Sequence, residues 1–117
     1  MNARNNHVDY IELPAAGANQ LRLIKDFYTQ VFGWKYKDWG EEYSDTSDSG
    51  VGSGINAGSD HPRAPLPVIY AEDLAAARKS VLANGGKVTR EIFSFPGGQR
   101  FHFSDSAGNE LAVWSDQ

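Results

Sequence analysis

The amino-acid sequence predicts an α+β domain made of two halves that share one order of elements: a strand, a helix and three strands. Residues 8–13 have the pattern of a half-buried strand, and a helical pattern follows between Asn19 and Gly33. The same succession begins again at Leu66, about 55 residues further along the chain. Residues 58–65, between the halves, are polar and contain two prolines, as is typical of a connection.

Each element of the first half has its own signal. Residues 8–13 alternate in chemistry until Pro14 ends the strand. Asn19 can cap the following helix and Gly33 can end it. The apolar side chains between them share one helical face: Leu21, Ile24, Phe27, Tyr28, Val31 and Phe32. The aromatic-bearing runs 34–39 and 43–48 predict a hairpin, and the glycine-rich run 51–57 predicts a third strand.

The second half repeats this order. Residues 66–71 form a short apolar run, and Asp73 can cap a helix that ends at the sequence Asn84-Gly85-Gly86. Three strands are predicted over 87–93, 100–104 and 110–115, the last two joined by a turn at 105–109. We therefore expect one domain over residues 1–117, with a first module at about 7–58 and a second at about 66–115.

Composition limits the classes of partner. The chain has 11 basic and 15 acidic residues, a net charge of −4, and no Lys/Arg cluster larger than a pair, so nucleic acid is not an expected partner. It has no cysteine, which excludes disulfides and thiolate ligands and suits a reducing compartment. No apolar run approaches the ~20 residues of a membrane span, and residues 1–6 lack an apolar signal-peptide core. We expect a cytoplasmic protein without a membrane partner.

Three segments carry a family resemblance. Residues 27–34, Phe-Tyr-Thr-Gln-Val-Phe-Gly-Trp, form a helix end that leads into a strand, and Asp73-Leu74 with 84–86 mark the second helix. Residues 101–111 form a hairpin, with Ser106 where a proline is usual. Together these segments resemble the vicinal oxygen chelate superfamily, which includes glyoxalase I, extradiol dioxygenases, fosfomycin-resistance enzymes and bleomycin-binding proteins. The resemblance covers nearly the whole chain.

The resemblance implies an architecture more firmly than a reaction. It implies two βαβββ modules that form a curled mixed sheet, with the helices on the outer face and a central cavity for a small molecule. It also implies a homodimer. Because one scaffold in this superfamily serves isomerases, oxygenases, transferases and drug-binding proteins, the function has to be argued from the site.

Metal-using members of the superfamily draw ligands from the first, fourth, fifth and eighth strands. By the resemblance, these positions fall near Tyr10, between Ser49 and Ser59, near Leu66 and at Ala112. The interval from Ser49 to Ser59 contains no Asp, Glu or His, and Leu66 and Ala112 are chemically inert. We therefore expect no metal and no other cofactor there, although Glu12 and His102 could form a looser and weaker pair of ligands.

Tyr10 and Glu12 are two residues apart on one predicted strand, so they share a face. The resemblance makes this the cavity face, where Tyr10 would contact a ligand and Glu12 would act as an acceptor or a general base. The alternative is that Glu12 pairs with Arg100 or accepts a hydrogen bond from a backbone turn.

Arg100 and His102 also share a strand face. The resemblance places His102 in the cavity as an acid/base candidate, and Arg100 could bind a carboxylate or phosphate of a ligand. In the alternative register, Phe101 and Phe103 face the cavity and His102 faces solvent. The sequence does not decide between these registers.

The remaining candidates are aromatic. By alternation from Leu66 and Ala112, Tyr70 and Trp114 fall on the cavity face, which favours a flat or apolar ligand held between rings. The alternative for both is a core position. His7 and His61 are expected to be ordinary surface residues.

These inferences lead to two hypotheses from different classes. The first is a metal-independent small-molecule-binding protein with a sequestering or resistance-like role, as in the bleomycin-binding proteins. The alternative is a glyoxalase-like lyase or isomerase in which Glu12 is the base and Arg100 or His102 stabilises an oxyanion.

Overall fold

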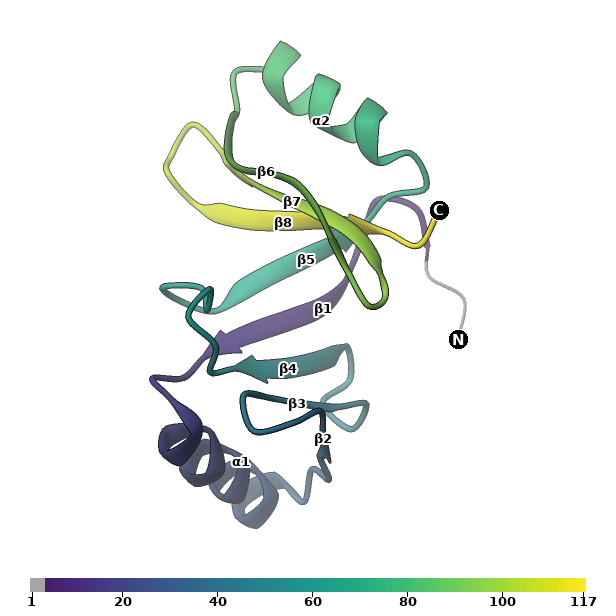
Figure 1. The fold of residues 1–117 in the computed structure, drawn as a ribbon. Helices are drawn as coiled ribbons and strands as arrows, with labels where there is room; N and C mark the ends of the chain where they lie inside the picture. The colour runs from purple at the N-terminus through teal and green to yellow at the C-terminus, as the bar shows by residue number, and fades with distance from the viewer. Residues whose placement is uncertain (1–3) are drawn as a thin grey trace. The chain divides into compact units, whose positions relative to one another are not determined.

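A computed structural model describes residues 4–117 and confirms the predicted repeat of one strand, one helix and three strands (Figure 1). The first set of elements is β1 (His7–Pro14), α1 (Ala18–Phe32), β2 (Lys37–Asp38), β3 (Tyr43–Thr46) and β4 (Gly52–Asn56). The second set is β5 (Leu66–Tyr70), α2 (Leu74–Ala83), β6 (Lys87–Phe95), β7 (Gly98–Ser104) and β8 (Glu110–Ser115). Over the described residues, no helix is long and apolar enough to cross a membrane.

The chain divides into two compact units, which are described here one at a time. The first unit is Tyr10–Leu66, and the second joins the chain up to Asp9 with Pro67–Gln117. In the first unit the strand order is β2-β3-β4-β1, with β1 parallel to β4 and the other pairs antiparallel. In the second unit the order is β5-β8-β7-β6, with β5 parallel to β8 and the other pairs antiparallel. The two modules therefore have the same topology.

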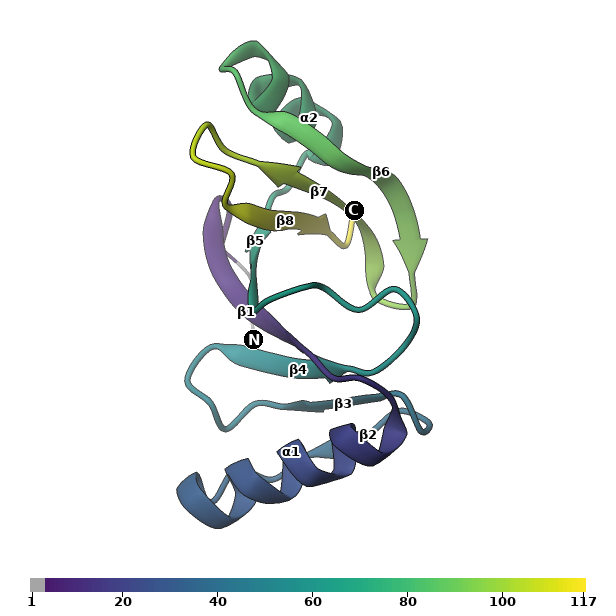
Figure 2. The same cartoon turned by 90° about the vertical axis from the view of Figure 1, so that its left-hand side faces the viewer.

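The core of the first unit lies between α1 and one face of its strands (Figure 2). Buried residues form this core together with partly buried neighbours: Ala15, Leu21, Ile55 and Ala57, with Leu13, Ile24 and Tyr36. Leu13 and Ile55 are direct partners across β1 and β4, so their side chains point to the same, helix-covered face. The neighbouring positions, Glu12 and Gly54, therefore lie on the opposite face of the strands, toward which the Glu12 side chain points.

Two details of the first unit differ from the sequence prediction. The residue that precedes α1 is Gly17, with no side-chain cap, whereas Asn19 was expected in that role and lies inside the helix. Strand β2 has only two residues instead of the predicted 34–39. Trp34 lies outside the strand: its ring stacks on Tyr28 and Phe32 at the end of α1, with centroids 5.3 Å from each, and its carbonyl accepts a hydrogen bond from Thr29 Oγ1. Gly33 ends the helix as predicted, at φ 76°.

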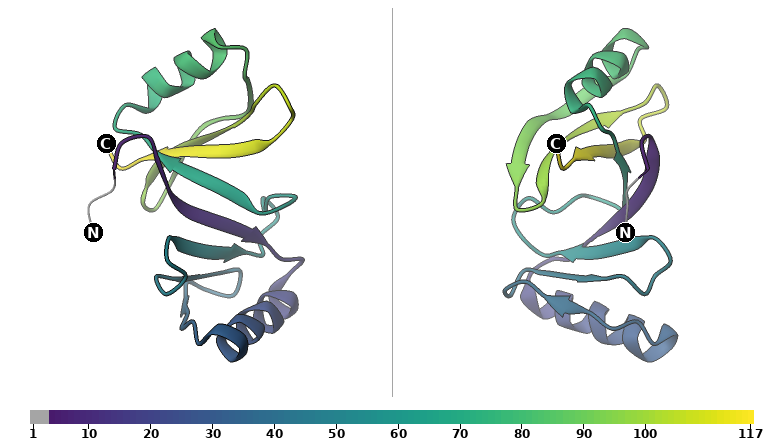
Figure 3. Two further views of the ribbon diagram at one scale, coloured as in Figure 1. Left: turned by 180° about the vertical axis from the view of Figure 1, so that it is seen from behind. Right: turned by 90° about the vertical axis from the view of Figure 1, so that its right-hand side faces the viewer.

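In the second unit, α2 covers one face of β6, β7 and β8 (Figure 3). Asp73 caps α2 as predicted, because its carboxylate accepts a 3.0 Å hydrogen bond from the backbone N–H of Ala76. The core beneath the helix is formed by Ala71, Leu74, Phe101 and Val113. Strands β6 and β7 extend beyond the predicted limits, and β6 has irregular pairing between Val88 and Phe93.

Candidate functional site

Glu12 is the centre of a hydrogen-bonded group on the face of the first unit that α1 does not cover. Its side chain is 1% exposed. The hydroxyl of Tyr43, from β3, donates to Glu12 Oε1 at 3.2 Å, and Asn56 Nδ2, from β4, donates to Oε2 at 3.5 Å. The hydroxyls of Tyr10 and Tyr43 lie 2.6 Å apart. Tyr10 and Glu12 thus share a face as predicted, and two residues that the sequence analysis did not select complete the group.

Gly54 provides the surface on which the two tyrosine hydroxyls meet. On β4, Gly54 pairs directly with Glu12. It lies between Gly52, which pairs with Tyr10, and Asn56, which pairs with Tyr43. A Cβ atom at Gly54 would overlap the hydroxyl oxygens of Tyr10 and Tyr43 and lie 2.8 Å from Cζ of Tyr43. The two phenols therefore approach the backbone of β4 more closely than any side chain at this position would allow.

The amide of Asn56 is oriented by its own hydrogen bonds. The backbone N–H of Gly58 donates to Asn56 Oδ1 at 2.9 Å, which turns Nδ2 toward Glu12. The same Nδ2 is 3.4 Å from Asp60 Oδ1. Glu12 is thus held by a phenol on one oxygen and an amide on the other, as a buried carboxylate requires.

The second unit carries the other predicted site residues in two cross-strand rows, on the face that α2 does not cover. Direct pairing aligns the first row, Tyr70, Trp114, Arg100 and Phe93, across β5, β8, β7 and β6. The second row is Val68, Ala112, His102 and Arg90. Phe101 belongs to the core under α2, and Phe103 packs against that core. This register places Arg100 and His102 on the face opposite the helix, and the alternative register is wrong.

Aromatic rings and cations are interleaved on this face. The guanidinium of Arg90 lies 3.6 Å from the ring centre of Phe93, and that of Arg100 lies 5.4 Å from the same ring. The rings of Phe93 and His102 are 5.9 Å apart. His102 is 6% exposed, and its Nδ1 lies 3.8 Å from Glu110 Oε2, an ion pair when the ring is protonated. Such a surface suits a flat molecule that carries negative charge.

Tyr70 and Trp114 are fixed at the other end of the row. Their rings are 5.0 Å apart and nearly perpendicular. The Tyr70 hydroxyl donates to Asp116 at 2.6 Å, and this hydrogen bond raises the pKa of Tyr70 and lowers the pKa of Asp116. Tyr70 is 4% exposed and Trp114 is partly buried, so Trp114 is the more accessible of the two.

The side chains present do not fit the metal site that the resemblance implies. Within residues 4–117, no three His, Asp or Glu side chains gather in a group that could hold a metal ion. Tyr10, near which the resemblance places the first-strand ligand, has a phenol in place of a carboxylate or imidazole, and residues 49–59, which include β4, contain no Asp, Glu or His. Leu66 and Ala112 are buried and have no donor atoms.

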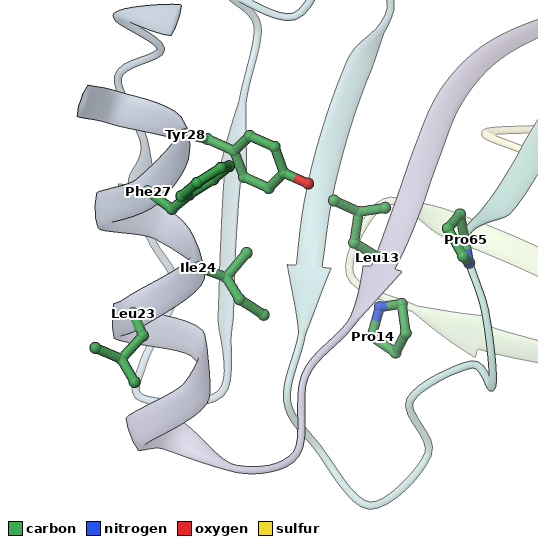
Figure 4. A pocket seen from close by; sticks show the side chains of 7 residues that line it. All are labelled: Leu13, Pro14, Leu23, Ile24, Phe27, Tyr28 and Pro65. Atoms are coloured by element: carbon green, nitrogen blue, oxygen red, sulfur yellow. The ribbon is translucent and has the colours of Figure 1, made fainter. Parts of the chain in front are cut away.

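An apolar groove lies elsewhere on the first unit, between α1 and the end of β1. It has a volume of about 370 Å³ and is lined by Leu13, Pro14, Leu23, Ile24, Phe27, Tyr28 and Pro65 (Figure 4). Leu23 and Phe27 are 71% and 58% exposed. None of the predicted site residues lines this groove.

The model of the Glyoxalase/Bleomycin resistance protein/Dioxygenase superfamily matches residues 6–113. The chain belongs to this superfamily. Among solved structures, a Mn(II)-bound glyoxalase from Novosphingobium aromaticivorans is 22% identical with a TM-score of 0.70, over 98% of this chain and 40% of that one. This chain thus spans about two fifths of that glyoxalase. No curated protein matches the sequence.

Two further solved structures have lengths similar to that of this chain. A methylmalonyl-CoA epimerase from Mycobacterium tuberculosis is 12% identical with a TM-score of 0.65, over 98% of this chain and 92% of the epimerase. A superfamily member from Vibrio splendidus 12B01 is 16% identical with a TM-score of 0.63, over 91% of this chain and 96% of that one. At these identities the likeness shows the fold alone.

The sequence analysis did not select four residues: two of the hydrogen-bonded group around Glu12 and two of the cross-strand rows in the second unit. Tyr43 lies in the run 43–48, which predicted only a strand of a hairpin. Asn56 lies in the interval 49–59, where only carboxylates and imidazoles were considered as ligands. Arg90 and Phe93 lie on β6, where the irregular pairing breaks simple alternation. An amide in the fourth predicted strand was the one available signal.

Proposed function

We propose that this superfamily member is a metal-independent protein that binds a small, partly aromatic molecule. The observation that carries the proposal is the cross-strand row of Trp114, Arg100 and Phe93. Trp114 and Phe93 are rings against which a flat ligand can pack, with the guanidinium of Arg90 over one face of Phe93. Arg100 stands between them with a planar guanidinium that matches a carboxylate or phosphate. The role would be sequestration or resistance, with the ligand leaving unchanged.

The proposal of metal independence is supported by the first unit. The interval 49–59, which includes β4, has no Asp, Glu or His to act as a fourth-strand ligand, and the hydroxyls of Tyr10 and Tyr43 fill the space over Gly54. The loose pair of Glu12 and His102 supplies too few donors for a selective site.

The experiment is a ligand screen with metal-stripped protein. Thermal shift and calorimetry would use aromatic carboxylates, phenols and apolar drugs, each with and without Mn²⁺, Ni²⁺ or Zn²⁺. A true ligand at a hundred times its Kd stabilises the folded state by about 2.7 kcal/mol. We expect saturable binding without metal, weakened strongly by Arg100→Ala and unchanged by the exposed Arg63→Ala. Binding that requires an added metal would contradict the proposal.

A second function is favoured by the buried carboxylate. Glu12 is held by Tyr43 and Asn56, a geometry suited to a general base in a lyase or isomerase. This reading predicts turnover of a hemithioacetal, a catechol or an epoxide, reduced by orders of magnitude in Glu12→Gln. Turnover that survives this substitution would assign the base elsewhere.

We also propose that the protein is a cytoplasmic homodimer, as the superfamily resemblance implies. The mass of one chain is 12.8 kDa. Light scattering should give about twice this mass, and a monomer at working concentrations would contradict the dimer. Localisation of a tagged chain in its host would test the compartment.

A further inference from the structure

Glu12, Tyr43 and Tyr10 form a continuous chain of hydrogen-bonding groups. Tyr43 Oη is 3.2 Å from Glu12 Oε1, and Tyr10 Oη is 2.6 Å from Tyr43 Oη. The carboxylate at one end is 1% exposed, whereas Tyr10 at the other end is only partly buried. Tyr43, between them, is partly buried as well, so the chain leads from a buried acid through one partly buried phenol to another.

The chain has a direction because a phenol has one proton. When Tyr43 donates to the ionised carboxylate of Glu12, Tyr43 has no further proton to give, so it accepts from Tyr10. When Glu12 is protonated, the order can reverse: Glu12 donates to Tyr43 and Tyr43 donates to Tyr10. The protonation state of Glu12 thus sets whether the hydroxyl proton of Tyr10 points into the chain or out of it.

We infer that Tyr43 and Tyr10 relay protons between Glu12 and a ligand group at Tyr10. A ligand with an acidic hydrogen, such as a phenol, an enol or a carbon acid beside a carbonyl, gives its proton to Tyr10 Oη. Tyr10 passes its own proton to Tyr43, and Tyr43 passes its proton to Glu12 Oε1. The ligand becomes an anion, Glu12 becomes neutral, and both tyrosines end as they began. Tyr10 contacts the ligand, and Tyr43 is a positioning residue that acts through it.

Gly54 is part of this relay. The hydroxyls of Tyr10 and Tyr43 meet over its Cα, in space that a methyl group would fill. Gly54→Ala therefore separates the two hydroxyls while leaving Tyr10, Tyr43 and Glu12 in the sequence. This variant disrupts the relay without removing any of its polar groups.

The relay would serve the second candidate function, that of a lyase or isomerase with Glu12 as base, and it rests on that proposal. The coupling between Glu12 and Tyr10 can nevertheless be measured without a ligand. The experiment is NMR of the full chain labelled with ¹³Cζ-tyrosine and ¹³Cδ-glutamate, assigned with single variants. In the unsubstituted protein, the Tyr10 and Glu12 signals should change with one shared midpoint as pH is varied. In Tyr43→Phe, the Tyr10 signal should no longer follow the Glu12 signal. Failure of a ligand screen would leave this measurement intact.

Three results decide the inference. Coupling that survives Tyr43→Phe would show a field effect through space and overturn the relay, as would a Tyr10 signal that never follows Glu12. A Glu12 that keeps one protonation state wherever the protein is folded would also overturn it, because it could not exchange a proton. Gly54→Ala should abolish the coupling, and Tyr28→Phe, outside this group on α1, should preserve it. Circular dichroism would confirm that each variant is folded before its spectrum is interpreted.

Discussion

The indole N–H of Trp114 points at the carboxylate of Asp9, with 2.9 and 3.2 Å to its two oxygens, although 105 positions separate the residues in the sequence. Both residues belong to the second compact unit. The contact therefore attaches the start of β1 to the last strand of the chain. A hydrogen bond to a charged group contributes more to stability than a neutral one.

We expect Asp9→Ala to lower the free energy of unfolding by about 1–2 kcal/mol, because the indole N–H loses a charged acceptor. Urea denaturation followed by circular dichroism would measure the loss. Asp9→Asn keeps an acceptor oxygen and should lose less. Equal stability of the alanine variant and the unsubstituted protein would show that water replaces this contact without cost.

Asp73 should contribute to stability through the start of α2. Its carboxylate accepts a hydrogen bond from Ala76 N–H at the first turn, so Asp73→Ala leaves that donor without a side-chain partner. We expect a loss of about 1 kcal/mol, and nearly none for Asp73→Asn, which is an equally good cap. Chemical denaturation of the two variants side by side would test this, and equal losses would point to charge instead of capping.

The capping residues also show where sequence reasoning succeeds. Asp73 was predicted because a short polar side chain before an apolar periodic run is a local signal, and the structure confirms it. Asn19 carried the same signal but lies inside α1, because the helix is preceded by Gly17, two residues before Asn19 and at φ 91°. Composition alone does not distinguish these cases, since the conformation of the preceding loop decides where the first turn begins.

The sequence predicted which site residues share a strand face, but not which side chains contact one another across strands. Alternation placed Tyr10 with Glu12, and Arg100 with His102, because side chains two apart on a strand share a face. The partnership of Tyr43 with Glu12 depends on how far two phenols can lean over a glycine of the neighbouring strand, which no local pattern encodes. Long-range pairing across β3, β4 and β1 creates that contact.

Tyr36 should make stability depend on pH in the alkaline range. Burial, with a smaller contribution from Tyr28, raises the pKa of Tyr36 from its ordinary value of 10.0 to about 12. Because the folded-state pKa is the higher one, the stabilising effect is complete below about pH 10 and is lost as pH rises through about 12. Denaturation midpoints measured across this range should fall more steeply in the unsubstituted protein than in Tyr36→Phe. Identical slopes would show that Tyr36 ionises freely in the folded state.

Phe101 and His102 are adjacent in β7 but serve opposite faces, so their substitutions should have different effects. Phe101 is fully buried under α2, and Phe101→Ala should cost about 3–5 kcal/mol of stability through the cavity it leaves. Where that variant does not fold, Phe101→Leu should fold with a smaller loss of stability.

His102 packs against Phe93 on the other face, and His102→Ala should affect binding of a ligand found in the screen more than it affects unfolding. Denaturation and calorimetry on the same preparations separate the two effects. A large stability loss for His102→Ala with unchanged binding would assign it a structural role, because a residue that only fills space acts on the folded state and not on the ligand.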